Sequence, residues 1–137
     1  MIAVVDASAA VRVSMKAGGP DSSDSLETLL ERAELVLAPE LIIAEVVNAF
    51  WKYLRAGVLS RALSEQGVRT ALDLVDQFAP MESLSVEALH LAALQERAAY
   101  DMFYLVLARR NGAVLITADE TLRRSARNLG IRTSESE

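Results

Sequence analysis

The sequence contains no cysteine, so disulfide bonds, thiolate metal ligands and cysteine nucleophiles are all excluded. It has a single histidine, His90, and a lone histidine is a poor basis for a zinc site or a serine–histidine triad. No apolar run approaches the ~20 residues of a membrane-spanning helix, and no signal-peptide pattern is visible. P-loop, G-x-G-x-x-G and G-x-S-x-G motifs are missing too. These absences favour a cytoplasmic protein that uses none of these chemistries.

Composition indicates one globular domain spanning residues 1–137, because 52% of its 137 residues are hydrophobic and 24% are charged. The net charge of −5 argues against nucleic acid as a partner. Setting aside the four acids discussed below leaves 15 acidic residues against 14 basic ones, so most of the imbalance lies in those four.

Short β-branched apolar runs alternate with helical patterns along the chain. Strands are predicted at residues 1–5, 35–38, 81–84 and 113–117, with a last edge strand at 131–133. Helices are predicted over residues 7–15, 25–33, 39–55, 60–78, 86–98, 101–110 and 119–129, with a loop at 18–20 and a frayed tail at 134–137. We expect Ser8 to cap the first helix, Ser22 or Ser23 the second, and the apolar 39–55 helix to be central and buried. Continuous apolar strands of this kind predict an α/β fold whose parallel sheet is covered on both faces.

Four carboxylates stand beside or inside apolar runs: Asp6, Glu45, Asp101 and Asp119. An unpaired buried carboxylate is costly, and the sequence places too few basic residues beside these four to pair each one. Asp6 and Asp119 follow strands, where parallel sheets place their sites, and Glu45 and Asp101 lie on helices that must pack nearby. A divalent cation would relieve their repulsion, and ligands that offer only oxygen favour Mg²⁺ or Mn²⁺.

Each acid also has a structural interpretation. Asp6, Asp101 and Asp119 precede or begin helices, where a carboxylate caps the backbone. Glu45 shares a helical face with Asn48 and Lys52, so the three side chains can instead form a solvated stripe. Thr117 and Ser8 are expected near the same crevice, where each hydroxyl either holds a carboxylate or satisfies the backbone.

The motifs Val4-Val5-Asp6-Ala7-Ser8, Pro39 to Ala49 around Glu45, Tyr100 to Ala108, and Leu115 to Asp119 resemble PIN-domain ribonucleases of the VapC toxin type. The resemblance covers nearly the full length of the chain, and the order and spacing of all four acids agree with it. It implies a three-layer α/β/α sandwich with a mainly parallel sheet. It also implies that Asp6, Glu45, Asp101 and Asp119 are the catalytic, metal-binding acids, with Thr117, Asn48 and Ser8 as site neighbours.

The same resemblance implies a Mg²⁺- or Mn²⁺-dependent endoribonuclease acting on RNA such as tRNA or rRNA, an antitoxin partner and a homodimer. Candidate phosphate contacts are Arg12, Arg109, Arg110 and Arg123, although any one of them can simply lie on a solvated helix face. Trp51, Leu54 and Leu63 can form core, a dimer surface or a groove for an amphipathic helix. The alternative function is a PIN-like RNA- or protein-binding module that has lost catalysis.

Overall fold

The computed structural model describes residues 1–15 and 23–134, so the expected loop at 18–20, the cap at Ser22 and the tail at 135–137 lie outside the described residues. The strands are β1 (Ile2–Val5), β2 (Leu35–Pro39), β3 (Gln77–Ala79) and β4 (Val114–Ile116). The helices are α1 (Ala7–Ser14), α2 (Ser23–Arg32), α3 (Leu41–Arg55), α4 (Arg61–Asp73), α5 (Ser85–Gln95), α6 (Ala99–Asn111) and α7 (Glu120–Asn128), with a 3₁₀ turn η1 (Glu82–Leu84).

The four strands form one sheet in the order β3-β2-β1-β4, and every pair of neighbours is parallel. Val4 of β1 lies opposite Leu37 of β2 on one side and Leu115 of β4 on the other. The carboxyl ends of β1 and β4 therefore meet, because Val5 is level with Ile116. This register brings the residue that follows β1 next to the residues that follow β4.

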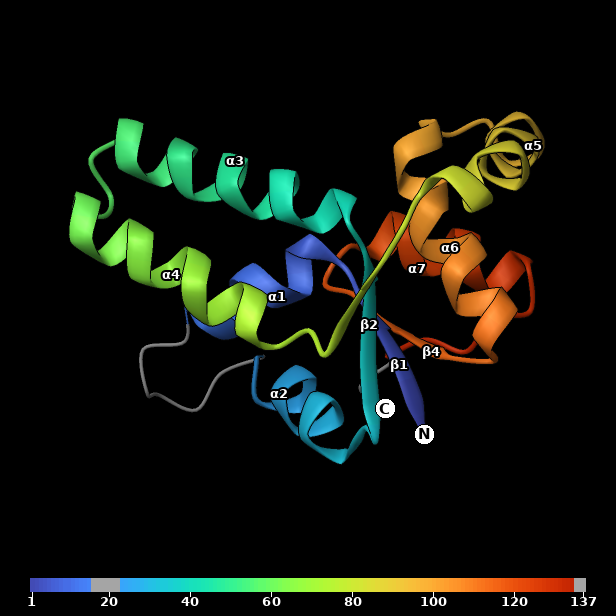
Figure 1. Cartoon of the computed structure of the whole chain (residues 1–137), viewed down its shortest axis with the longest axis horizontal. Coiled ribbons are helices and arrows are strands. Elements are labelled where there is room, and N and C mark those ends of the chain that lie inside the picture. The colour runs from blue at the N-terminus through green and yellow to red at the C-terminus, as the bar shows by residue number, and fades with distance from the viewer. Residues whose placement is uncertain (16–22, 135–137) are drawn as a thin grey trace.

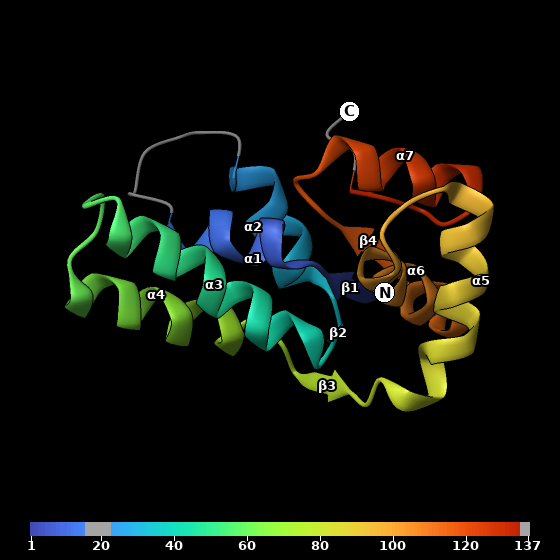
Figure 2. The same ribbon diagram turned by 90° about the horizontal axis from the view of Figure 1, so that it is seen from above.

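Helices cover both faces of the sheet, which gives three layers (Figure 1). In Figure 2, α1 to α4 lie on one side of the strands and α5, α6 and α7 lie on the other. The core is apolar and continuous, and its largest fully buried side chains include Tyr104, Phe50, Ile42 and Leu91. The predicted three-layer α/β/α fold with a parallel sheet is confirmed.

The third strand lies elsewhere than predicted. The expected helix over residues 60–78 ends at Asp73, β3 comprises Gln77–Ala79, and the expected strand at 81–84 is η1. Asp76 explains the change, since its amide donates to the carbonyl of Val36 and its carboxylate accepts from the amide of Val36, both over 2.8 Å. These two bonds align the chain beside β2, and Pro80, which has no N–H, follows the last residue of β3.

Helix α3 is less buried than expected. Only Ile42, Val46 and Phe50 are buried, whereas Val47 and Trp51 are about half exposed. The helix packs against α1 and α4 along one stripe, so its remaining apolar side chains face outward. Pro39 was expected in its first turn but is the last residue of β2.

Three further predictions, about the cap of α1, the edge strand and the tail, differ from the structure. Asp6, not Ser8, caps α1, because its carboxylate accepts from the amide of Ala9 over 3.0 Å. The expected edge strand at 131–133 reduces to one bridge between Leu115 and Thr133. Ser134, expected in a frayed tail, is 4% exposed. Within the described residues, no helix is long and apolar enough to cross a membrane.

Candidate functional site

A pocket of about 460 Å³ opens where the carboxyl ends of β1 and β4 meet α3 and the first half of α6. All four predicted acids line it: Asp6, Glu45, Asp101 and Asp119. Ser8 and Asn48 line it as well, whereas Thr117 lies directly behind Asp6. Four separate elements therefore each bring one carboxylate to one cavity.

Asp6 lies deepest, with 5% of its surface exposed. One carboxylate oxygen accepts from the Ser8 hydroxyl over 2.8 Å and from the Ala9 amide over 3.0 Å, and the other accepts from the Thr117 hydroxyl over 2.5 Å. Burial nevertheless raises the pKa of Asp6 from 3.8 to about 6, since the loss of hydration outweighs these three bonds, and the negative charge of Asp119 adds to the rise.

Thr117 joins the two strand ends chemically. While its hydroxyl donates to Asp6, the same oxygen accepts from the amide of Asp119 over 3.0 Å. Ser8 adds a parallel link, because its oxygen accepts from the amide of Ala118 over 3.0 Å. Ser134 fixes the Thr117 backbone by accepting from its amide over 3.0 Å. The hydroxyls of Thr117 and Ser8 thus have both roles that the sequence left open, because each donates to the Asp6 carboxylate and each accepts from a backbone amide.

Glu45 is half-buried, and the Tyr104 phenol donates to its Oε1 over 2.5 Å; the ion pairs among the described residues include none between Glu45 and Lys52. Burial raises the pKa of Glu45; the bond from Tyr104 opposes that rise, and the charges of Asp101 and Asp6 add to it. Glu45 lines the same pocket as Asp101 and Asp6, so the three carboxylates are close enough to repel one another. Tyr104 is 2% exposed, so its hydroxyl is a fixed donor that orients Glu45.

Asp101 lies in the first turn of α6 but does not cap it, since no side chain makes a capping bond at that end. Its Oδ2 instead accepts from the guanidinium of Arg97 over 2.9 Å, and the two side chains are 26% and 20% exposed. The sequence reasoning missed Arg97, although its i, i+4 spacing from Asp101 was a readable signal of an ion pair.

Asp119 serves both as a cap and as part of the pocket wall. Its Oδ1 accepts from the Thr121 hydroxyl and from the amides of Thr121 and Leu122. Burial pushes the pKa of Asp119 up, but these three donors and the charge of Arg97 outweigh burial and hold it below its ordinary value. The neighbouring Glu120 points away, where it pairs with Arg123 and Arg127.

The donor set suits a hard divalent cation, because every pocket acid offers oxygen, and because burial, to which the charges of neighbouring acids add, raises the pKa of both Asp6 and Glu45. Among the described residues, however, no three acidic or histidine side chains come close enough together to hold one ion. Each acid accepts hydrogen bonds from its own donors. Thr121 and Leu122 donate to Oδ1 of Asp119, Tyr104 donates to Oε1 of Glu45, and Arg97 donates to Oδ2 of Asp101. The second oxygens, Oδ2 of Asp119, Oε2 of Glu45 and Oδ1 of Asp101, are the ones that the pocket can offer as ligands.

Most of the proposed phosphate contacts are engaged elsewhere. Arg109 and Arg110 both pair with Glu87 at the other end of α6, and Arg123 donates to Glu120 and to the carbonyl of Thr117. Those three arginines and Arg12 do not line the pocket, whereas Lys52 does. His90 is exposed on α5, away from the pocket.

The class defined by this geometry is a three-layer α/β/α protein with a parallel sheet and four acids beyond the strand ends. The sequence profile of the PIN domain matches residues 3–128, so the chain belongs to the PIN domain family. A comparison with curated protein sequences found no match.

Solved structures share the fold over nearly their full lengths. PAE2754 from Pyrobaculum aerophilum is 25% identical with a TM-score of 0.72, covering 98% of this chain and 92% of its own. VapBC2 from Rickettsia felis, bound to a DNA fragment from their promoter, is 16% identical with a TM-score of 0.68, covering 97% of both chains. VapBC-1 from nontypeable Haemophilus influenzae is 16% identical with a TM-score of 0.64, covering 97% and 96%.

Proposed function

We propose that this PIN domain is a Mg²⁺- or Mn²⁺-dependent endoribonuclease and the toxin of a toxin–antitoxin pair. The observation that carries the proposal is the meeting of Asp6, Glu45, Asp101 and Asp119 in one pocket from four separate elements. Glu45, Asp101 and Asp119 are each held by donors through one oxygen, and their second oxygens support a role as metal ligands. Membership of the PIN domain family supports the same chemistry.

In this proposal Asp6, Asp101, Glu45 and Asp119 hold the cation directly or through water. A divalent cation held there would stabilise charge on the phosphate and would lower the pKa of a nucleophilic water. Thr117 and Tyr104 fix the orientation of Asp6 and Glu45, so neither carboxylate must reorganise during the reaction. Glu45, held through Oε1, keeps Oε2 available to orient the attacking water or accept its proton.

Cleavage of total RNA with mapping of the new ends tests the activity. We expect cleavage with Mn²⁺ or Mg²⁺, none with EDTA, and none from Asp101→Asn. A matched control is Asp73→Asn, which changes an exposed acid outside the pocket and should cleave at the parent rate. If Asp101→Asn cleaves as fast as the parent, the assignment of these acids is wrong.

The alternative function is a PIN-like module that binds RNA or protein without catalysis. A metal that binds only the native state stabilises it by about 2.7 kcal/mol at 100 times its dissociation constant, so the melting temperature reports binding directly. We expect millimolar Mn²⁺ to raise the melting temperature of the parent and not that of Asp101→Asn. An unchanged parent, together with no cleavage, favours the binding module.

The toxin assignment includes an antitoxin partner and a homodimer. A groove of about 310 Å³ between α3 and α4, with Val47, Trp51, Leu54 and Val68 in its wall, suits an amphipathic helix of the antitoxin. Expression of the chain alone should arrest growth, and Asp101→Asn should relieve the arrest. A co-expressed antitoxin should restore growth for the parent but not for Val47→Asp. Sedimentation of the purified chain tests the dimer.

A further inference from the structure

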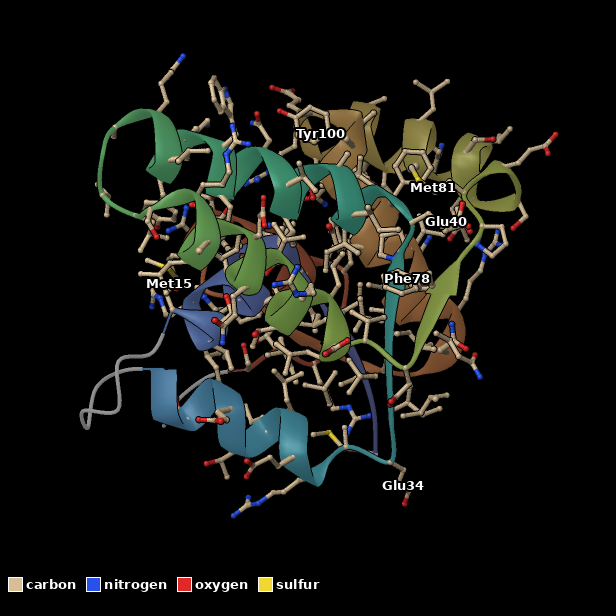
Figure 3. All side chains as sticks on the ribbon, turned by 60° about the vertical axis from the view of Figure 1, so that its left-hand side comes forward. Met15, Glu34, Glu40, Phe78, Met81 and Tyr100 are labelled. Carbon is tan, nitrogen blue, oxygen red and sulfur yellow. The ribbon has the colours of Figure 1, made fainter. Side chains whose placement is uncertain are left out.

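The acidic pocket has an open mouth and a closed back. Tyr100 lines the mouth, is 56% exposed and stands at the edge of the molecule (Figure 3). Behind Asp6, by contrast, Thr117 is 0% exposed and Ser134 is 4% exposed. Solvent does not reach this closed side, so the polar groups there depend on hydrogen-bond partners from the protein itself.

The chain returns to the closed side after the last helix. Gly130 follows α7 with a φ of +75°, a left-handed conformation that glycine adopts without strain, and the chain turns back along β4. The amide of Leu115 then donates to the carbonyl of Arg132, and the amide of Ser134 donates to the carbonyl of Leu115, both over 2.8 Å. Residues 132–134 therefore lie along the outer edge of β4, the last strand of the sheet.

At the next step of this ladder one side chain takes the place of a strand. In a parallel ladder the amide and the carbonyl of Thr117 would both bond to the backbone of a neighbouring strand, as those of Leu115 do. The Ser134 hydroxyl replaces both partners, because it accepts from the Thr117 amide over 3.0 Å and donates to the Thr117 carbonyl over 3.2 Å. Ser134 thus holds the backbone of the residue whose hydroxyl donates to Asp6 and accepts from the amide of Asp119.

We propose that Ser134 is a positioning residue for the acidic pocket and acts on Asp6 and Asp119 through Thr117. This proposal rests on the metal-dependent function above. Ser134 does not line the pocket, so it has no direct part in ligand binding or chemistry. Without its hydroxyl the buried amide of Thr117 has no acceptor, and the chain after β4 must shift to find one. That shift moves the Thr117 hydroxyl away from Asp6 and leaves this carboxylate without its fixed direction.

Binding of Mn²⁺ to the full chain, followed by the electron paramagnetic resonance signal of the free ion, tests this role without cleavage. Ser134→Ala should weaken Mn²⁺ binding about tenfold, the lower end of the effect of losing a group that orients a metal ligand. Ser134→Thr keeps the hydroxyl and should bind Mn²⁺ as the parent does. Should Ser134→Ala not fold, Ser134→Cys, whose thiol is a weaker acceptor, is measured in its place with a loss of affinity again expected.

Ser64→Ala is the matched control, because it removes another buried serine hydroxyl at a distance from the acids. Ser64 is 5% exposed on α4, and its hydroxyl donates to the carbonyl of Ser60 over 2.8 Å. It lies outside the acidic pocket, so its loss should lower the urea midpoint and leave Mn²⁺ affinity unchanged.

A double-mutant cycle separates positioning from a purely structural role. Thr117→Val keeps the backbone amide that Ser134 binds but removes the hydroxyl that reaches Asp6. In that background Ser134→Ala should still lower the urea midpoint, yet it should change Mn²⁺ affinity by no more than about twofold, the margin within which uncoupled effects add. An equal loss of affinity in both backgrounds would mean that Ser134 does not act through Thr117.

Failure of this role and failure of the nuclease function give different results. If the parent binds Mn²⁺ and cleaves RNA while Ser134→Ala binds Mn²⁺ as tightly as the parent, the positioning role is wrong and the nuclease stands. If the parent neither binds Mn²⁺ nor cleaves RNA, the proposed function fails and the positioning role fails with it.

Discussion

Replacing Asp6 with Asn should stabilise the metal-free protein at neutral pH. Asp6 is 5% exposed, and burial raises its pKa from 3.8 to about 6 despite the donors Thr117, Ala9 and Ser8. Asparagine has nearly the same shape as aspartate and no charge. The substitution therefore removes a buried negative charge without opening a cavity.

The magnitude follows from the pKa. A rise of about two units corresponds to roughly 3 kcal/mol of unfavourable free energy for the ionised form, at about 1.4 kcal/mol per unit. Asparagine loses part of this gain, because its amide nitrogen cannot accept from the Thr117 hydroxyl, and a lost bond of this kind costs about 1–2 kcal/mol. The net gain should be about 1–2 kcal/mol, which raises the melting temperature of a chain of this size by about 3–8 °C.

The pH dependence gives the reasoning a second check. Between pH 3.8 and about 6 the folded protein binds the Asp6 proton more tightly than the unfolded chain does. Stability from the protonated carboxyl is therefore complete below that window and is lost as the pH rises through about 6. The advantage of Asp6→Asn should be largest above pH 7, and near pH 4, where only the lost Thr117 bond counts, the variant should be about 1–2 kcal/mol less stable than the parent.

Urea denaturation in EDTA at pH 7.5 and pH 4 measures both effects. Asp73→Asn is the control, since it removes an exposed carboxylate and should leave the free energy of unfolding unchanged within about 0.5 kcal/mol. The reasoning is refuted if Asp6→Asn is less stable than the parent at pH 7.5, or if its advantage is the same at both pH values.

The remaining predictions concern Tyr104, which donates to Glu45, and Gly67, which lies against the ring of Phe50. Tyr104→Phe removes the donor to Glu45, so we expect a loss of about 1 kcal/mol of stability and a further rise in the pKa of Glu45, seen as a shift of the acidic limb of the activity profile to higher pH. Unchanged stability together with an unchanged profile would show that the bond is unimportant. Gly67→Ala places a Cβ atom against the ring of Phe50, which is 1% exposed, so we expect a loss of about 1–3 kcal/mol in urea denaturation. A raised urea midpoint would mean that the Phe50 ring moves aside at little cost.

The convergence of the acids could be predicted because it depends on a rule of topology. Residues that follow neighbouring parallel strands meet at one edge, which places Asp6 and Asp119 together whatever the details of packing. The donors that hold each acid could not be predicted in the same way. Tyr104 lies 59 positions from Glu45 in the sequence, so only the packing of α6 against the rest of the core brings them together.

Errors in the predicted fold arose where one pattern fits two structures. Apolar residues around Phe78 continue the helical spacing of α4, but the same residues also suit a short strand, and the bonds of Asp76 to Val36 favour the strand. The apolar surface of α3 predicted complete burial because such a surface usually needs a covering partner. Within the described residues the monomer covers one stripe of it, which leaves Trp51 exposed.

The role of Asp6 as a helix cap does not explain why this position carries a charge. A helix cap needs only a side-chain oxygen, and asparagine caps about as well as aspartate. The charge on Asp6 therefore adds only about 1 kcal/mol to the cap of α1 through the helix dipole, whereas burial makes it costly by roughly 3 kcal/mol at neutral pH. Asp119 differs, because its donors and Arg97 hold its pKa below the ordinary value and its charge costs little. A neutral asparagine would suffice for the cap, so the buried charge of Asp6 needs another explanation. A cation ligand requires a negatively charged oxygen, and that requirement explains the aspartate at this position.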